Sequence, residues 1–239
     1  MPTKRSIADI AADIARTSSP ALVVDTCVSL DIVRCAWRAK PRIAAIAIQF
    51  IEAHLAGELY LCAPSVLQKE AGRNRAEVEG EARRKARDVD ESITHYRRAV
   101  AHAGGNYPHT AAYSHESLIP LLMSLHDRFL ATCVHILPED NNKAAAFARA
   151  SDNRRPARKG GGANDCLLFE EFRSLAQVVP AADPLVLLTT NPDDFTDKSK
   201  AGAVHQDISD GLAGMKGQLC LDWDWAAKLV LTAARLKSI

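Results

Sequence analysis

The sequence predicts an α/β fold with three layers, in which a central and mostly parallel sheet is covered by helices on both faces. Short apolar segments, such as residues 21–24 and 185–188, stop abruptly at polar residues. This pattern is typical of buried parallel strands. Longer segments with helical periodicity alternate with these strands, as the connections of a parallel sheet require. At 239 residues, the chain is long enough for a large core, and we expect one domain over residues 1–239.

The first half of the chain is expected to open with a short amphipathic helix, because Ile7, Ile10 and Ile14 recur at helical spacing. This helix should end before Ser18. Proline is well suited to the first turn of a helix, so Pro64 favours a long helix after the second strand. The further elements expected in this half are strand 21–24, helices 29–37 and 43–55, strand 58–62 and helix 65–101.

The second half is expected to complete a helical insertion over residues 73–150 and then to return to the sheet. Residues 151–163 are polar, basic and rich in glycine, which favours a mobile loop that contacts the substrate. The elements expected here are a loop at 103–108, helices 116–134 and 144–150, a helix from 164, strand 185–188, an edge strand at 219–221 and a helix at 225–236. Residues 201–217 have no clear assignment.

Composition limits the partners of the chain. The formal net charge is +1, so the whole molecule does not attract a polyanion and any nucleic acid must bind at a local basic patch. A basic run over residues 73–87 is interleaved with acidic residues, which predicts a solvated helix with internal ion pairs. Asp9 and Asp13 interrupt any secretory signal, and no apolar segment is long enough to cross a bilayer. A cytoplasmic protein without membrane insertion is expected.

The six cysteines are scattered and lack the spacing of a zinc site. Reduced thiols are the simplest interpretation. Cys27 and Cys166 are expected to be small buried residues. At least one of Trp223 and Trp225 is expected to pack against the sheet rather than to stack on a base.

Acidic and amide side chains are expected to converge at one edge of the sheet. Asp25 and Asn191 each follow an apolar strand, while Glu70 and Asp165 lie early in predicted helices, and Asp194 follows closely. Ligands gather outside the carboxyl ends of parallel strands. Carboxylates packed this closely stay ionised only if a cation neutralises them, and hard oxygen ligands select Mg²⁺ or Mn²⁺. The expected chemistry is metal-assisted phosphodiester hydrolysis.

Each of these residues also has a structural interpretation. An aspartate after a strand, such as Asp25, is often a helix cap, and Asp165 could cap its own helix. A helical glutamate such as Glu70 is usually exposed to solvent. The functional hypothesis therefore depends on the ordered set rather than on any single residue.

Four segments in that order resemble the successive motifs of PIN-domain nucleases. They are L-V-V-D-T-C at residues 22–27, P-S-V-L-Q-K-E at 64–70, G-G-A-N-D-C-L-L at 161–168 and L-L-T-T-N-P-D-D-F at 187–195. The resemblance extends over residues 21–195 and is interrupted by a long helical insert between the second and third motifs. The segment at 156–166 further resembles a PIN subgroup with enlarged helical inserts.

The resemblance implies an endoribonuclease with one or two Mg²⁺ or Mn²⁺ ions that cleaves single-stranded RNA, as a toxin or a defence nuclease. It implies catalytic roles for Asp25, Glu70, Asp165 and Asp194, and metal binding by these four and Asn191. Asn191 stands where the family often has aspartate, which puts a second metal in doubt. The residues expected to contact substrate are Thr26, Arg155, Arg158, Lys159 and Thr190, the three basic ones because they could hold a phosphate backbone beside the metal.

Three other classes of protein share part of this pattern. A haloacid-dehalogenase-type phosphatase needs a second aspartate two residues after Asp25, and Cys27 occupies that position. A non-catalytic RNA-binding or scaffold module is favoured only by Asn191, and a structure-specific DNA nuclease shares the same chemistry.

The insert could form a homodimer or bind an inhibitory partner such as an antitoxin.

Overall fold

The protein forms a six-stranded sheet in which every strand pairing is parallel. The computed structural model describes residues 3–38, 40–105, 114–157, 162–179, 184–197 and 203–237. The strands are β1 (Lys4–Arg5), β2 (Ala21–Val24), β3 (Tyr60–Ala63), β4 (Val134–Ile136), β5 (Leu185–Leu188) and β6 (Gly217–Cys220). Their order across the sheet is β1-β4-β3-β2-β5-β6. The α/β prediction is confirmed, and the sheet is entirely parallel.

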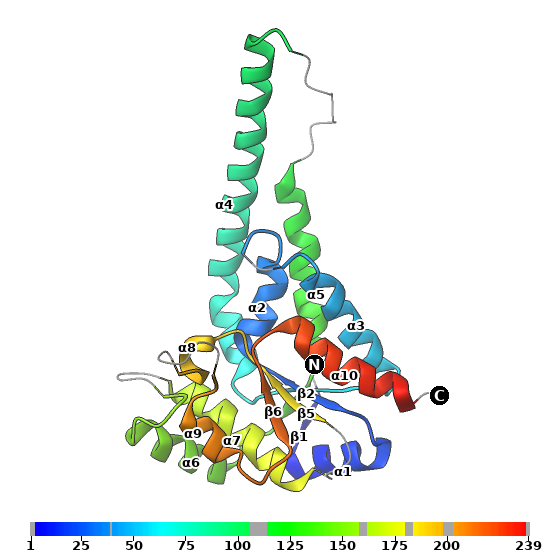
Figure 1. Ribbon diagram of the computed structural model, residues 1–239, viewed down its shortest axis with the longest axis vertical. Coiled ribbons are helices and arrows are strands. Elements are labelled where there is room, and N and C mark those ends of the chain that lie inside the picture. Colours follow the sequence, from blue (N-terminus) through cyan, green and yellow to red (C-terminus); the bar gives the residue numbers. More distant parts are fainter. Residues whose placement is uncertain are drawn as a thin grey trace.

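Helices cover both faces of this sheet, which is the three-layer arrangement that the sequence predicts (Figure 1). The first helices along the chain are α1 (Ile7–Thr17), α2 (Thr26–Arg34), α3 (Ile43–Leu55) and α4 (Leu67–His102). A 3-10 helix, η1 (His115–Leu118), leads into α5 (Ile119–Thr132), which is followed by α6 (Asp140–Ser151) and α7 (Ala163–Val178). The last helices are α8 (Pro192–Phe195), α9 (Gln206–Gly211) and α10 (Trp223–Lys237). Among the described residues, none of these helices is both long and apolar enough to span a bilayer.

The two faces of the sheet bury alternate side chains of each strand. In β2, Leu22 and Val24 belong to the core shared with α2, α3, α5 and α10, whereas Ala21 and Val23 belong to the core shared with α1 and α7. The residues of β2 and β5 are at most 1% exposed. A strand buried on both sides needs apolar residues at every position, which explains why these segments are uninterrupted apolar runs.

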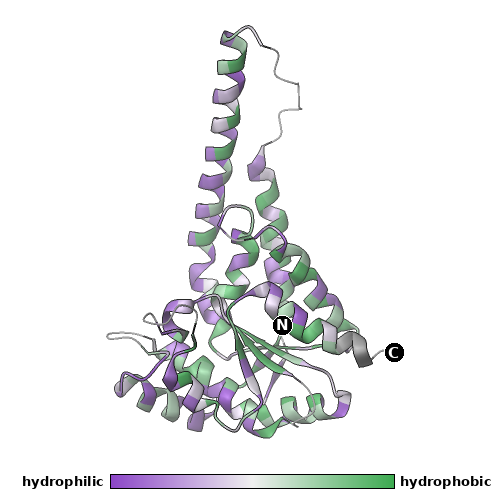
Figure 2. Cartoon of the chain, in the orientation of Figure 1, coloured by the Kyte–Doolittle hydropathy of each residue, from purple (hydrophilic) through white to green (hydrophobic). Residues whose placement is uncertain are grey.

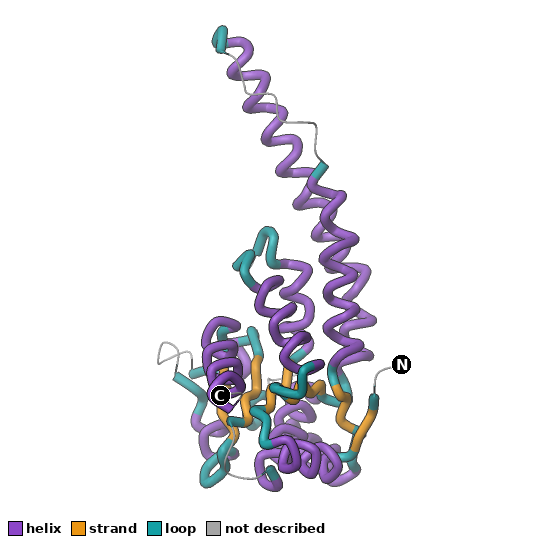
Figure 3. The backbone as a smooth tube through the Cα atoms, turned by 90° about the vertical axis from the view of Figure 1, so that its right-hand side faces the viewer, coloured by secondary structure: helices purple, strands orange, loops and turns teal. Residues whose placement is uncertain are grey.

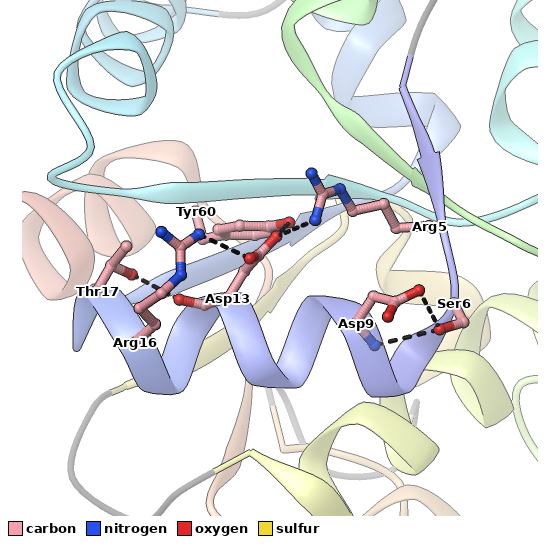
Figure 4. Close-up of polar contacts among 7 residues, drawn as sticks. All are labelled: Arg5, Ser6, Asp9, Asp13, Arg16, Thr17 and Tyr60. Carbon is pink, nitrogen blue, oxygen red and sulfur yellow. Dashed lines mark hydrogen bonds and ion pairs between the residues drawn. The ribbon is translucent and has the colours of Figure 1, made fainter.

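Helix α1 docks on the sheet through a polar cluster centred on Asp13 (Figure 4). The Asp13 carboxylate accepts hydrogen bonds from Arg5 at 2.7 Å, from Arg16 at 2.8 Å and from the Tyr60 hydroxyl at 3.1 Å. These bonds lower the pKa of Asp13 against the opposing effect of burial. They tie α1 to β1 and β3, and Ser6 caps its first turn by accepting from the Asp9 amide.

Helix α4 projects far beyond the sheet (Figure 1). Its first half packs against α2 and α5 through a small apolar cluster that includes Val78, Ala82 and Met123. Figure 3 shows α4 and α5 running side by side away from the sheet, and Figure 2 shows hydrophilic and hydrophobic residues alternating along α4. The ion pairs expected on this helix are present, for example between Arg83 and Glu79 at 2.7 Å.

Several element boundaries differ from the sequence-based predictions. The helix expected over residues 116–134 ends at Thr132, and Val134–Ile136 forms β4 of the sheet. Strand β1 was not expected at all. Both strands contain only two or three residues, which is too few for an alternating or apolar pattern to emerge. The range 73–150 therefore contains a strand of the sheet, and the segment that leaves the sheet runs from α4 to α5.

The sheet has a topological switch point between β2 and β5. The chain leaves β2 into α2, which packs on one face, but it leaves β5 into α8 and α9, whose Phe195 and Ile208 belong to the core on the other face. The two strands are direct neighbours. In open parallel sheets, ligands bind at such a switch point, outside the carboxyl ends of the strands. Asp25 and the segment that begins at Thr189 follow these two strand ends.

Candidate functional site

Asp25 is the N-cap of α2 and lies at the switch point. Its Oδ1 accepts a hydrogen bond from the Thr26 amide at 2.5 Å, and its Oδ2 accepts from the Thr189 hydroxyl at 2.7 Å and from the Cys27 thiol at 2.9 Å. Burial raises the pKa of Asp25 and the charge of Glu70 adds to the rise, while the three hydrogen bonds oppose it. Asp25 is therefore a cap, as its structural interpretation expects, but a buried one that faces another carboxylate.

Glu70 connects three segments of the chain that are far apart in sequence. It lies in the first turn of α4 and accepts a hydrogen bond from the Thr26 hydroxyl at 2.6 Å. Its other oxygen accepts from the Asn164 side-chain amide, in the first turn of α7. The carboxyl end of β2 and the starts of α4 and α7 therefore meet at one corner, as the sequence predicts. Asn164 was not among the predicted site residues.

Asp165 directly follows Asn164 and shares the first turn of α7. It is half-buried, and its charge contributes to the raised pKa of the neighbouring Cys166 thiol, for which burial is the main cause. Gly162 is the N-cap of α7, and its φ of 98° lies in the left-handed region that favours glycine. A larger residue there would strain the turn that places Asp165 at this corner.

The segment after β5 reaches Asp25 through Thr189. The Thr189 hydroxyl donates to Asp25 and accepts a hydrogen bond from the Asn191 amide at 3.2 Å. The Asn191 side chain donates in turn to Asp194, which is 5% exposed. Asn191 and Asp194 thus belong to the same hydrogen-bonded network as Asp25. They are linked to Asp25 only indirectly, through the Thr189 hydroxyl.

Of the residues expected to contact substrate, the structure describes Thr26, Arg155 and Thr190. Thr26 and Thr190 are both engaged by carboxylates, since the Thr190 hydroxyl donates to Asp31 at 2.6 Å. Arg155 is tied to the segment after β5, because its guanidinium donates to the Asp193 carbonyl at 2.9 Å. Arg158 and Lys159 lie outside the described residues.

Other basic and aromatic residues have structural roles. Arg149, part of the same basic run as Arg155, is buried against Glu170 at 2.6 Å. Trp223 is 2% exposed and stacks on Phe50, whereas Trp225 is 52% exposed, so the expectation that one tryptophan packs in the core is confirmed.

Glu171 is a buried carboxyl group that the sequence did not single out. It accepts hydrogen bonds from the Ser65 amide at 2.8 Å and from the Ser65 hydroxyl at 2.5 Å. Burial raises its pKa to about 7, although the bonds from Ser65 oppose the rise. Ser65 lies between β3 and α4, so Glu171 anchors the segment that leads to Glu70.

The described hydrogen-bond donors to the Asp25 and Glu70 carboxylates are all uncharged groups. Neither Asp25 nor Glu70 forms an ion pair with any described Lys, Arg or His, and their hydrogen-bond donors are hydroxyl, thiol and amide groups. Their hard oxygen atoms are the donors that Mg²⁺ and Mn²⁺ prefer. Within the described ranges, however, no three His, Cys, Asp or Glu side chains lie close enough together to hold one metal ion. Binding by three carboxylates would require side chains of this corner to turn toward each other.

Comparisons with protein-family models, with curated proteins and with solved structures found no match for this chain.

Proposed function

We propose that the chain is a divalent-metal-dependent nuclease that hydrolyses phosphodiester bonds, with single-stranded RNA as its expected substrate. The observation that supports this most strongly is the hydrogen-bonded chain from Thr26 through Glu70 to Asn164. It gathers the first three PIN-like motifs at the carboxyl edge of the sheet, beside a buried aspartate that forms no ion pair with any described basic residue.

In this proposal Asp25, Glu70 and Asp165 hold Mg²⁺ or Mn²⁺. Bound there, the ion would lower the pKa of a coordinated water and offset negative charge on the phosphodiester. The protein's own groups fix the ligand geometry, because Thr189 orients Asp25 while Thr26 and Asn164 orient Glu70. Asn191 and Asp194 form the outer part of the site, and Arg155 lies near enough to the segment after β5 to bind the phosphate backbone.

The proposal is tested by measuring Mn²⁺-dependent cleavage of single-stranded RNA, structured RNA and DNA by the wild type, Asp165→Asn and Glu70→Gln. Removal of a metal ligand should lower the cleavage rate by at least about tenfold. Asp152→Asn and Glu58→Gln are matched controls, because both residues are exposed and neither side chain contacts the site. Their rates should equal that of the wild type.

The outcome also separates the possible substrates. Cleavage of DNA alone would replace the RNA assignment with a structure-specific DNA nuclease. Equal activity of all five proteins, or no activity on any substrate with Mn²⁺ present, would reject the nuclease. The role as a toxin or defence nuclease, and an antitoxin-like partner or a second copy bound at α4 and α5, remain predictions.

A further inference from the structure

The helices that carry Glu70 and Asp165 are joined by two polar contacts. In the first, the Glu70 carboxylate accepts a hydrogen bond from the Asn164 side chain. In the second, the Glu171 carboxylate of α7 accepts from the Ser65 amide at 2.8 Å and from the Ser65 hydroxyl at 2.5 Å. Ser65 leads into α4, and Asp165 and Glu171 both lie on α7. The two metal-ligand positions are therefore connected a second time, outside the site itself.

This second connection is short on both sides. Glu70 follows Ser65 by five positions, and its amide already donates to the Val66 carbonyl at 3.1 Å. On α7, Glu171 follows Asp165 by six positions, which is about 9 Å along a helix axis. Because the backbone is regular over both stretches, a shift of Ser65 relative to Glu171 would also shift Glu70 relative to Asp165.

Apolar packing does not supply this connection. The clustered apolar side chains of α4 pack with α2, α3 and α5. Those of α7 pack with α1 and with α6, on the other face of the sheet. Among the described residues, no apolar cluster contains side chains of both α4 and α7. This leaves the two polar contacts to fix the start of α4 against α7.

Glu171 has the chemistry that such a contact requires. It is 0% exposed, and a carboxylate can accept from two donors at once. Hydrogen bonds to an ionised acceptor are also stronger than those between neutral groups. Burial of a carboxyl group costs stability and raises the pKa of Glu171 to about 7. An apolar residue would avoid this cost, but it would leave the Ser65 amide without its acceptor.

We propose that Glu171 is a positioning residue of the metal site, which acts through Ser65 to hold Glu70 and Asp165 in the relative position that lets both bind one Mg²⁺ or Mn²⁺ ion. This rests on the proposed nuclease function. Residues that orient metal ligands from outside the coordination shell change metal affinity by about 10–100-fold when they are removed. Since Glu171 does not touch the metal or the substrate, its loss should raise the metal concentration that the protein needs without changing the rate at saturation.

The test measures Mn²⁺ affinity without substrate, by calorimetric titration of the wild type and three variants. Glu171→Leu lacks an acceptor and should bind Mn²⁺ at least about tenfold more weakly. Glu171→Gln keeps an acceptor for the Ser65 amide and offers an N–H to its hydroxyl, so its affinity should be close to that of the wild type. Ser65→Ala keeps the amide and loses the hydroxyl, and its affinity should lie between those of the wild type and Glu171→Leu.

A second measurement separates positioning from a loss of stability. Cleavage is followed over a range of Mn²⁺ concentrations. Glu171→Leu should raise the concentration for half-maximal rate by the same factor as in calorimetry and keep the maximal rate of the wild type. A merely structural role would lower the folded fraction, and with it the maximal rate, at an unchanged Mn²⁺ midpoint. Val230→Ala is the matched control, because it should destabilise the core on the opposite face of the sheet from α7 and bind Mn²⁺ as the wild type does.

Two outcomes would overturn the role of Glu171 and leave the nuclease standing. One is wild-type Mn²⁺ affinity in folded Glu171→Leu, or in Ser65→Ala if Glu171→Leu does not fold. The other is an equal loss of affinity in Val230→Ala. Weakened Mn²⁺ binding by Glu171→Leu in a protein that cleaves no nucleic acid would support the positioning role and reject the nuclease. No Mn²⁺ binding by the wild type would reject both, because there would be no metal ligands to position.

Discussion

At the scale of single residues, the ionisation of Glu171 links burial to stability. It is 0% exposed and its pKa is raised to about 7 by burial, above its ordinary value of 4.5. Between these two pH values the native state binds more protons than the unfolded state. The free energy of unfolding must therefore decrease as the pH rises through this window.

We expect Glu171→Gln to lose this pH dependence. In the wild type, Glu171 should lower the free energy of unfolding by up to about 3 kcal/mol between pH 4.5 and pH 7. Glutamine cannot ionise, yet it can still accept a hydrogen bond from Ser65. Urea unfolding at several pH values measures the free energy of unfolding of both proteins. The contribution of Asp25 is common to both proteins and cancels in the difference.

The exposed control Glu58→Gln should retain the slope of the wild type. If the stability of Glu171→Gln varied with pH as steeply as that of the wild type, Glu171 would not have a raised pKa in the folded protein.

At the scale of elements, two glycines show how packing decides the effect of the same substitution. Gly72 lies on α4, and a Cβ atom added there would meet nothing within 4 Å. Gly217 lies on β6, where an added Cβ would approach Phe172 of α7 to 2.8 Å and Ala176 to 3.2 Å. The close approach of α7 to β6 therefore requires glycine at position 217, whereas α4 does not require it at 72.

Gly72→Ala is expected to stabilise the protein by about 0.5–1 kcal/mol, because alanine loses less backbone entropy in a helix. Gly217→Ala should destabilise it by about 1–3 kcal/mol through overpacking. Denaturant unfolding of both variants measures the two signs. A stabilised Gly217→Ala would show that α7 does not pack this closely on β6.

At the scale of the whole molecule, a metal that binds only the folded protein should raise its stability. The expected gain is about 2.7 kcal/mol at a concentration of a hundred times the dissociation constant. Mn²⁺ should therefore raise the melting temperature of the wild type and of Asp152→Asn, but not of Asp25→Asn. Differential scanning calorimetry with and without EDTA measures this shift. An equal shift in Asp25→Asn would place the metal elsewhere.

The projecting α4 also belongs to this scale. Its apolar contacts with α2 and α5 are made by Val78, Ala82 and Ala86. Val89 and Tyr96 lie farther along the helix, toward its C-terminal end, and are 43% and 70% exposed. The same helix begins with Glu70 at the site. A partner bound to the projection would thus contact the element that carries a proposed metal ligand.

Local patterns in the sequence determined much of the fold. Helix 43–55 and strand 185–188 were predicted with the bounds that the structure shows, because the periodicity of a helix and the apolar run of a buried strand are set by neighbouring residues. The sequence also indicated that the segments carrying Asp25, Glu70 and Asp165 would meet at one edge of the sheet.

Only the tertiary structure decided which side chains pair at that edge. Glu70 and Asn164 are separated by 94 positions, and Asp25 and Thr189 by 164, so no local pattern could reveal their contacts. The burial of Glu171 and its contact with Ser65 likewise arise where distant elements pack. Periodicity is a property of neighbours along the chain, whereas a site is formed by the path that the chain takes through space.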